Sequence, residues 1–143
     1  MSLVHEIGTV RISQIIGAHF AECLQEPIIA ADLLNATEMY FLQGNDGGYL
    51  GFLMPCQIHG MTGMVQKTVP NINLDKDTLF IQHLYVTSNR QWQGHEQRLL
   101  ILLNCQTAIG AWASGLAGDI FKSIGFYFPP GAECFCYKPL TRY

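Results

Sequence analysis

Three observations predict an α/β fold for this chain of 143 residues. Strand-like and helix-like segments alternate along its second half, which is typical of α/β layering. The segment 79–103 joins an apolar strand to an apolar helix through a short polar turn. Hydrophobic residues make up 49% of the chain, enough to bury a sizeable core at the usual size of one domain. We therefore expect a single domain over 1–143.

Two helices are predicted in the N-terminal quarter. Apolar residues recur at helical spacing from Ile12 to Leu24, with Ser13 as the N-terminal cap. Pro27 suits the first turn of a second, short helix, and Asn35 suits its end. We expect both helices to turn an apolar face inward.

A hairpin is predicted next, with strands at 39–43 and 48–58. The turn 44–47 contains Gly, Asn and Asp, which tolerate positive φ. The segment 59–77 places its apolar residues irregularly, so we expect a loop that carries at most a distorted strand. Such a loop is long for a connector. The sequence leaves open whether it borders a binding cleft or is a mobile excursion.

The segment 79–86 predicts a strand, which a polar turn connects to a leucine-rich helix. Gln91, Gly94 and Glu96 occupy the turn. Backbone N–H groups at a helix opening, together with the positive end of the helix dipole, suit an anion such as a pyrophosphate. The turn is therefore a candidate phosphate site.

The remaining chain predicts a short strand, a short helix and a terminal hairpin. The strand covers 108–113 and the helix covers 116–123. The hairpin pairs 126–128 with 133–138 across a Pro-Pro-Gly-Ala turn.

The cysteines argue against a metal site, since they form an odd set with no C-x-x-C and no paired histidine spacing. The last two are two residues apart on a predicted strand, so we expect both to be small buried groups on one face. Reduced thiols fit a cytoplasmic protein. The five are Cys23, Cys56, Cys105, Cys134 and Cys136.

Charge and hydropathy exclude several classes of partner. Charged residues are 13% of the chain and the net charge is −3, so no positive field would recruit nucleic acid or an anionic membrane. The sequence has no apolar run of about 18 residues and no signal-peptide pattern. We expect a soluble, cytoplasmic protein.

The strand-turn-helix segment resembles the signature of the GNAT N-acetyltransferase superfamily, in which the fourth strand ends in a valine before a Gln/Arg-x-x-Gly-x-Gly/Ala turn. Val86 fits the strand end, and Gln91 and Gly94 fit the first two signature positions. Glu96 stands where the family has Gly or Ala.

A second segment, Ser114 to Phe126, is similar to the family's Asn-x-x-Ala-x-x-Phe-Tyr-x-x-x-Gly-Phe motif. Ala117, Gly125 and Phe126 match it. Ser114 replaces Asn, Ile120 replaces Phe and Phe121 replaces Tyr. The resemblance covers the chain from about Met39 to its end.

The resemblance implies a three-layer α/β fold, in which helices flank a mixed sheet whose parallel fourth and fifth strands splay apart. It also implies acetyl-CoA, or another acyl-CoA, as co-substrate, with the pantetheine arm against the main chain of Leu84, Tyr85 and Val86. The diphosphate would lie at the turn, which comprises Gln91, Trp92, Gln93, Gly94, His95 and Glu96. The implied activity is acetyl transfer to a small-molecule or peptide amine by direct attack on the thioester.

The catalytic positions implied by the resemblance are altered here. The family's base corresponds to Gln82 and His83, of which only His83 can accept a proton. The alternative is that His83 is a packed or surface histidine without a catalytic role. Since neighbouring strand residues point to opposite faces, we expect only one of them to face the cleft. The family's acid Tyr is Phe121, which donates no proton. Tyr127 is a weaker alternative acid, and water or the thiolate's own basicity could also suffice.

Glu96 raises the question of whether a diphosphate can bind. A carboxylate about 5 Å from one phosphate charge costs about 3 kcal/mol at an effective dielectric near 20. The acidic preference of a helix start is worth only about 0.3–1 kcal/mol. Binding survives if Glu96 turns outward or is neutralised by Arg90, His95 or Arg98. Trp92 could stack on an adenine or seal a protein interface, and the sequence favours neither.

Two other functions remain open. One is a catalytically inactive GNAT-like binding or regulatory module, in which Glu96 only caps its helix and a homodimer forms through apolar surface. The other is an unrelated α/β domain whose strand-turn-helix resembles the motif by chance.

Overall fold

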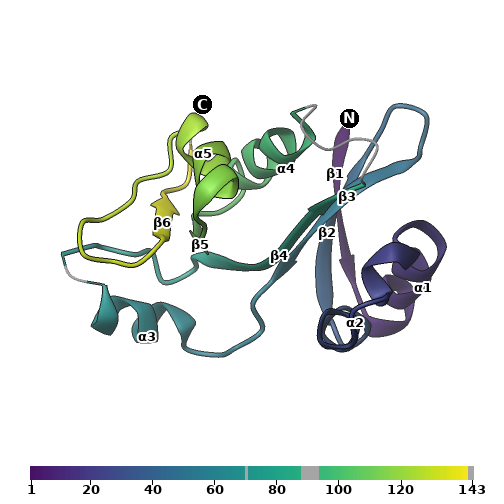
Figure 1. Ribbon diagram of the computed structural model, residues 1–143, viewed down its shortest axis with the longest axis horizontal. Helices are drawn as coiled ribbons and strands as arrows, with labels where there is room; N and C mark the ends of the chain where they lie inside the picture. Colours follow the sequence, from purple (N-terminus) through teal and green to yellow (C-terminus); the bar gives the residue numbers. More distant parts are fainter. Residues whose placement is uncertain (70, 88–93, 142–143) are drawn as a thin grey trace.

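The computed structural model describes residues 1–69, 71–87 and 94–141, which form one six-stranded mixed sheet (Figure 1). The strands lie in chain order, and every neighbouring pair is antiparallel except β4 and β5, which are parallel. The α/β class and the mixed sheet are thereby confirmed. The elements are β1 (Ser2–Ile7), α1 (Thr9–His19), the 3-10 helix η1 (Ala21–Leu24), α2 (Pro27–Leu34), β2 (Glu38–Gln43), β3 (Tyr49–Pro55), α3 (Met61–Thr68), β4 (Leu79–Val86), α4 (His95–Asn104), β5 (Ile109–Trp112), α5 (Gly115–Ser123) and β6 (Phe135–Lys138).

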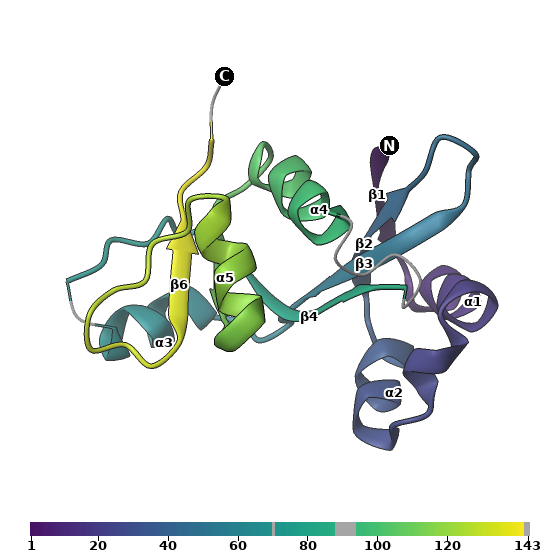
Figure 2. The same cartoon turned by 45° about the horizontal axis from the view of Figure 1, so that its top comes forward.

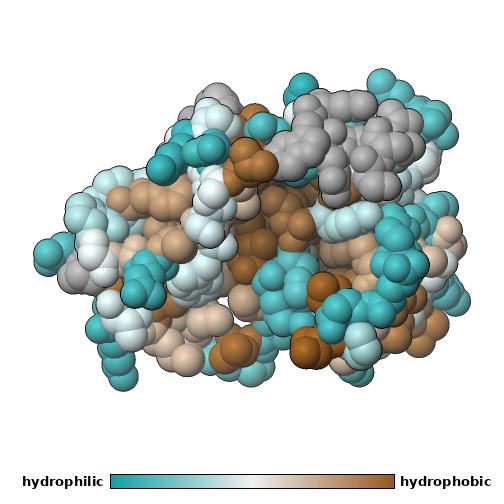
Figure 3. All heavy atoms as spheres, in the orientation of Figure 1, coloured by the Kyte–Doolittle hydropathy of each residue, from teal (hydrophilic) through white to brown (hydrophobic). Residues whose placement is uncertain are grey.

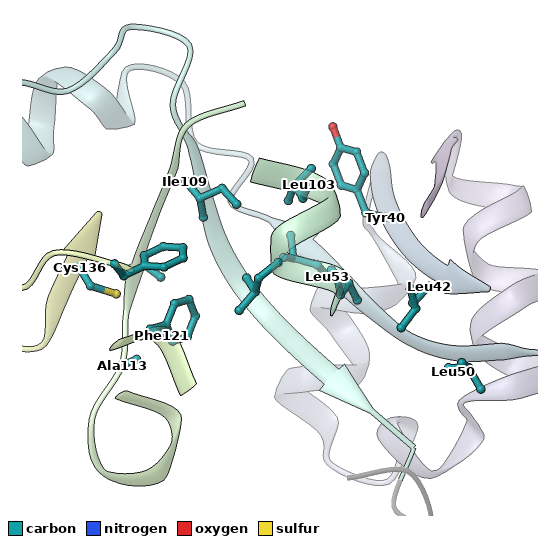
Figure 4. Close-up of a cluster of buried hydrophobic side chains, with 13 residues drawn as sticks. Tyr40, Leu42, Leu50, Leu53, Leu103, Ile109, Ala113, Phe121 and Cys136 are labelled. Atoms are coloured by element: carbon teal, nitrogen blue, oxygen red, sulfur yellow. The ribbon is translucent and has the colours of Figure 1, made fainter. Parts of the chain in front are cut away.

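Helices cover both faces of the sheet (Figures 1 and 2). On one face, α4 and α5 bury leucines and phenylalanines against β2 to β5, as the cluster around Leu103 and Phe121 shows (Figure 4). On the other face, α1 and α2 cover a second cluster around Phe20 and Phe52. The α3 helix adds a third cluster through Val65. The result is a three-layer arrangement.

The predicted helix starts are right for α2 and wrong for α1. α2 begins at Pro27, where the Glu26 carboxylate accepts a 2.7 Å hydrogen bond from the N–H of Ile29. α1 begins at Thr9 after Gly8. Ser13 therefore lies inside α1, and its hydroxyl donates to the Leu34 carbonyl at 3.4 Å instead of capping the helix. Tertiary contact with α2 gives this hydroxyl a different partner.

Two elements were not expected from the sequence. β1 pairs antiparallel with β2, but none of its six residues is fully buried and its apolar residues do not alternate regularly, which weakens the strand pattern. α3 occupies 61–68, where we predicted a loop. Only Val65 of α3 is buried, and Gly63 lies within the helix, so the apolar signal is weak. The helix is stabilised by packing on the sheet rather than by its own sequence.

The C-terminal hairpin is reduced to a single bridge, in which Tyr127 and Tyr137 exchange two backbone hydrogen bonds of 2.8 and 2.9 Å.

Cys136 is fully buried on β6 as expected, but Cys134 is exposed and precedes the strand. Its φ of 56° breaks the alternation that would have put both thiols on one face.

Gly51 sets the spacing between β3 and β4. A Cβ atom at this position would lie 2.5 Å from the Tyr85 carbonyl oxygen and 3.0 Å from a Val86 methyl group. Only a residue without a side chain lets the two strands approach this closely. Gly51 therefore helps to position the part of β4 from which the candidate site is built.

Among the described helices, none is both long and apolar enough to cross a membrane.

Candidate functional site

The parallel strands β4 and β5 separate soon after they meet. Their register contains two pairs, Leu79 with Ile109 and Phe80 with Gly110. Beyond these pairs a cavity of about 300 Å³ lies between the strands and beneath α5. We call this cavity the slot. It is lined by Ile81, Gln82, Leu84, Tyr85, Val86, Glu96, Ala111, Trp112, Ala113, Ala117, Ile120 and Phe121.

A second cavity lies on the α1/α2 side of β4. It has a volume of about 400 Å³ and is formed by η1, α2, β3 and β4. Leu84 and Tyr85 line both this cavity and the slot, so the two spaces are separated by a short stretch of β4. The surface over β4 is apolar in the middle of the face shown in Figure 3. We call the second cavity the acidic cavity, because Glu22 and Glu26 are among its lining residues.

A β-bulge lies in β4 between the two cavities. Met54 pairs with His83, and the next residue of β3, Pro55, pairs with Ile81, so Gln82 is an extra residue in β4. Because of the extra residue, the side chains before and after the bulge no longer alternate regularly between the two faces of the sheet. Ile81 and Leu84 therefore both pack on the face that α4 and α5 cover.

We expected Gln82 and His83 to point to opposite faces of the sheet, and the bulge makes this expectation wrong. Gln82 Nε2 donates to Asp32 Oδ2 at 3.1 Å, and His83 Nε2 lies 2.9 Å from the same oxygen. Both side chains therefore meet one carboxylate from α2. Asp32 is a site residue that our sequence reasoning missed. The available signal was that Asp32 is the one charged residue in the otherwise apolar segment Pro27–Leu34.

His83 is placed so that it can accept a proton. It lines the acidic cavity, and its side chain is 25% exposed. When Nε2 carries the hydrogen that is donated to Asp32, the ring presents Nδ1 as an acceptor. A carboxylate in this position also stabilises the imidazolium that forms on protonation.

Tyr85 points into the acidic cavity, where its hydroxyl donates to Glu22 Oε1 at 2.9 Å. Burial, and then the hydrogen bond to Glu22, raise the pKa of Tyr85. Burial and the charge of Glu22 raise the pKa of the neighbouring Cys23 from 9.0 to about 11. Both groups are neutral near pH 7, so the carboxylates supply the charge of this cavity.

Glu96 faces the slot. It is the second residue of α4, its exposed fraction is 9%, and Oε2 has no hydrogen-bond partner among the described residues. The structure therefore contradicts an outward orientation. Within the described ranges, the carboxylate makes no ion pair with His95 or Arg98. Arg90 lies outside these ranges.

The other predicted site residues divide into three groups. Leu84, Tyr85 and Val86 line the slot. Gly94 precedes α4 with a φ of 84°, and His95 is buried in its first turn. Gln91, Trp92 and Gln93 lie outside the described residues.

Phe121, at the position of the family's acid, and Tyr127, the alternative acid, differ in location. Phe121 lines the slot and packs edge-to-face on Phe126, with 4.8 Å between ring centroids. Tyr127 is 56% exposed and is not among the residues that line either cavity.

The described part of the chain contains no group of three or more His, Cys, Asp or Glu residues that could hold a metal ion.

Solved structures with the same arrangement of elements are known. Tetrahymena GCN5 matches 94% of this chain over 88% of its own, with a TM-score of 0.56 and 14% identity. A GNAT-family acetyltransferase from Staphylococcus aureus Mu50 matches 98% of the chain over 100% of its own, with a TM-score of 0.59 and 11% identity. The GNAT-family N-acetyltransferase YhbS from Escherichia coli, solved with CoA, matches 97% over 82%, with a TM-score of 0.58 and 15% identity.

These likenesses include the N-terminal strand and helices that precede Met39, and so extend beyond the resemblance seen in the sequence. No protein-family model matches the sequence, and neither does any curated protein.

Proposed function

We propose that this chain, which has the fold of the GNAT N-acetyltransferases, is an acyl-CoA-dependent N-acetyltransferase acting on a cationic amine. The observation that carries the proposal is the pair of cavities that meet at the bulge of β4. The slot suits an extended acyl donor, and the acidic cavity suits an amine. Leu84 and Tyr85 line both, so a donor and an acceptor bound there would approach each other across two residues.

The slot fits a pantetheine arm. β5 pairs with only the first two residues of β4, so a ligand in the slot can lie against the strand that continues past this point. Apolar side chains from α5 and β5 cover the opposite wall. Leu84, Tyr85 and Val86 would hold the arm, and Gly94 and His95 would border the diphosphate. Acyl-CoA, when bound, supplies the thioester carbonyl that the amine attacks.

The acidic cavity favours a positively charged acceptor. Glu22 and Glu26 line it, Asp32 lies at His83, and the lining residues that the structure describes include no Lys or Arg. An ammonium group would be attracted to this site and oriented by it. It would then have to lose a proton before attack, and His83 Nδ1 would accept that proton while Asp32 stabilises the imidazolium.

The leaving group finds no tyrosine at the position that the resemblance assigns, since Phe121 donates no proton. Water is the proton source in this proposal, and Tyr127 as the acid stays a prediction. Positioning of the two substrates would then provide most of the rate.

The first test is donor binding. Acetyl-CoA at about 100 times its dissociation constant adds about 2.7 kcal/mol to the free energy of unfolding. At about 2–4 °C per kcal/mol, the melting temperature should rise by about 5–10 °C. An unchanged melting temperature at millimolar acetyl-CoA would refute the proposal.

The second test is catalysis by His83. Thiol release from acetyl-CoA would be followed with a panel of diamines and lysine peptides. Replacing His83 by Ala should lower kcat at least about a hundredfold and leave acetyl-CoA binding unchanged. His5→Ala is the matched control, because His5 makes an equal 2.9 Å contact with Glu38 on the β1–β2 pair. Equal loss of kcat in both variants would exclude His83 as the base.

A catalytically inactive binding module is the second candidate, and Phe121 in place of the acid tyrosine favours it. This function predicts a thermal shift with acetyl-CoA, but no thiol release with any amine of the panel.

A further inference from the structure

The most unusual polar group in the described structure is the carboxylate of Glu96. It is about nine-tenths buried and Oε2 has no hydrogen-bond partner among the described residues. An unsatisfied buried carboxylate is costly, and native proteins rarely keep one without a reason. The slot that it lines provides a reason, because a ligand there could supply the missing donor.

Among the described residues that line the slot, Glu96 is the only one with a carboxylate. Two other polar side chains of the lining have partners elsewhere, since Gln82 donates to Asp32 and Tyr85 donates to Glu22. The rest of the described lining is apolar apart from the Trp112 ring, so among these side chains Glu96 is the one that offers an acceptor without a partner.

The position of Glu96 in α4 also decides which anion occupies the helix start. Glu96 is the second residue of a ten-residue helix, where the free N–H groups and the dipole favour negative charge. The protein's own carboxylate therefore lies in the first turn of α4, close to where a phosphate would bind. A diphosphate carries only hydrogen-bond acceptors at neutral pH and would be repelled by this carboxylate.

A pantetheine arm offers what the carboxylate lacks. It carries two amide N–H groups and a hydroxyl group, and all three can donate to a carboxylate oxygen. We infer that Glu96 accepts a hydrogen bond from an amide N–H of the pantetheine arm, so that the slot recognises its donor through the arm more than through the diphosphate. This inference rests on the proposed acyl-CoA function.

The experiment compares two probes, acetyl-CoA and acetyl-pantetheine, of which the second lacks the nucleotide and its diphosphate. Binding is measured by calorimetry on the whole chain, without an amine acceptor. Glu96→Met keeps the length of the side chain but removes the acceptor, while Glu96→Gln keeps an acceptor oxygen. Gln97→Ala is the control, because Gln97 also has a buried oxygen without a partner but does not line the slot.

We expect Glu96→Met to weaken acetyl-pantetheine binding about tenfold or more, because the variant loses a hydrogen bond to a charged group. Glu96→Gln should weaken binding less than Glu96→Met, because it keeps a neutral acceptor oxygen. Gln97→Ala should stay within about threefold of the unsubstituted protein. The melting temperature without ligand verifies folding, and Glu96→Ala replaces the Met variant if the latter does not fold.

The inference is overturned if Glu96→Met binds acetyl-pantetheine as tightly as the unsubstituted protein. Tighter binding of acetyl-CoA by this variant, with no loss of acetyl-pantetheine binding, would show that the carboxylate acts only by repelling the diphosphate, which also overturns the inference. Either result leaves the proposed function intact. If the unsubstituted protein binds neither probe, the proposed function itself fails and the inference fails with it.

Discussion

Replacing Gly51 by Ala tests whether the β3–β4 spacing supports the site. The added Cβ would lie 2.5 Å from the Tyr85 carbonyl oxygen, whereas Cβ atoms in proteins essentially never approach closer than 3.0 Å. The β4 backbone must therefore move by at least about 0.5 Å. Overpacking of this kind costs about 1–3 kcal/mol, which should lower the melting temperature by about 3–10 °C. The displaced residues, Tyr85 and Val86, line the slot, so the thermal shift with acetyl-CoA should also shrink.

The measurement is thermal unfolding followed by circular dichroism, with and without acetyl-CoA. Gly63→Ala is the matched control, because an added Cβ there meets no atom within 4 Å and Gly63 lies within α3. Alanine is favoured over glycine inside a helix by about 0.5–1 kcal/mol, so this variant should melt slightly higher. A Gly51→Ala protein that melts within about 1 °C of the original, with an unchanged ligand response, would refute the reasoning.

Two further predictions concern the slot and the core. Phe121→Tyr adds a hydroxyl where the resemblance puts the acid, so kcat for thiol release should rise about tenfold or more with little change in KM. An unchanged kcat in a folded variant would show that protonation of the leaving group is not limiting. Burial, and then the charge of Cys134, raise the pKa of Cys136 from 9.0 to about 12. The unfolded thiol ionises first, so stability is intact below about pH 9 and is lost as the pH rises toward 12. Urea unfolding at pH 8, 9 and 10 should therefore show a shallower decline for Cys136→Ala, and an equal decline would contradict the assignment.

The elements that the sequence predicted correctly are those with strong local signals. Pro27 has a fixed φ that suits a helix start, and the Gly-Asn-Asp-Gly turn at 44–47 accepts the backbone that a hairpin needs. The apolar strand 79–86 and the helix after Gly94 were found through their hydrophobic pattern. These features depend on neighbouring residues and can be predicted without knowing the rest of the fold.

The elements that were missed depend on contacts between distant segments. β1 and α3 are weakly patterned and are held by pairing with β2 and by packing around Val65. From its neighbours in the sequence, Ser13 looked like a helix cap. Its actual partner, the Leu34 carbonyl, lies at the end of another helix and could not be foreseen from those neighbours. In each case the deciding partner lies more than ten residues away in the chain or in another layer.

The candidate site shows the same division. The sequence alone determined which groups are present: a histidine that can take a proton, a phenylalanine where an acid is expected, and an acidic residue at the start of a helix. Only the tertiary structure decided where they lie, because the bulge at Gln82 depends on pairing with β3 and His83 contacts Asp32, 51 residues away in the chain. The burial of Glu96 likewise depends on how α4, β4 and α5 enclose the slot. Local sequence sets the chemistry of each side chain, whereas its partners and its exposure to water follow from the packing of elements far apart in the chain.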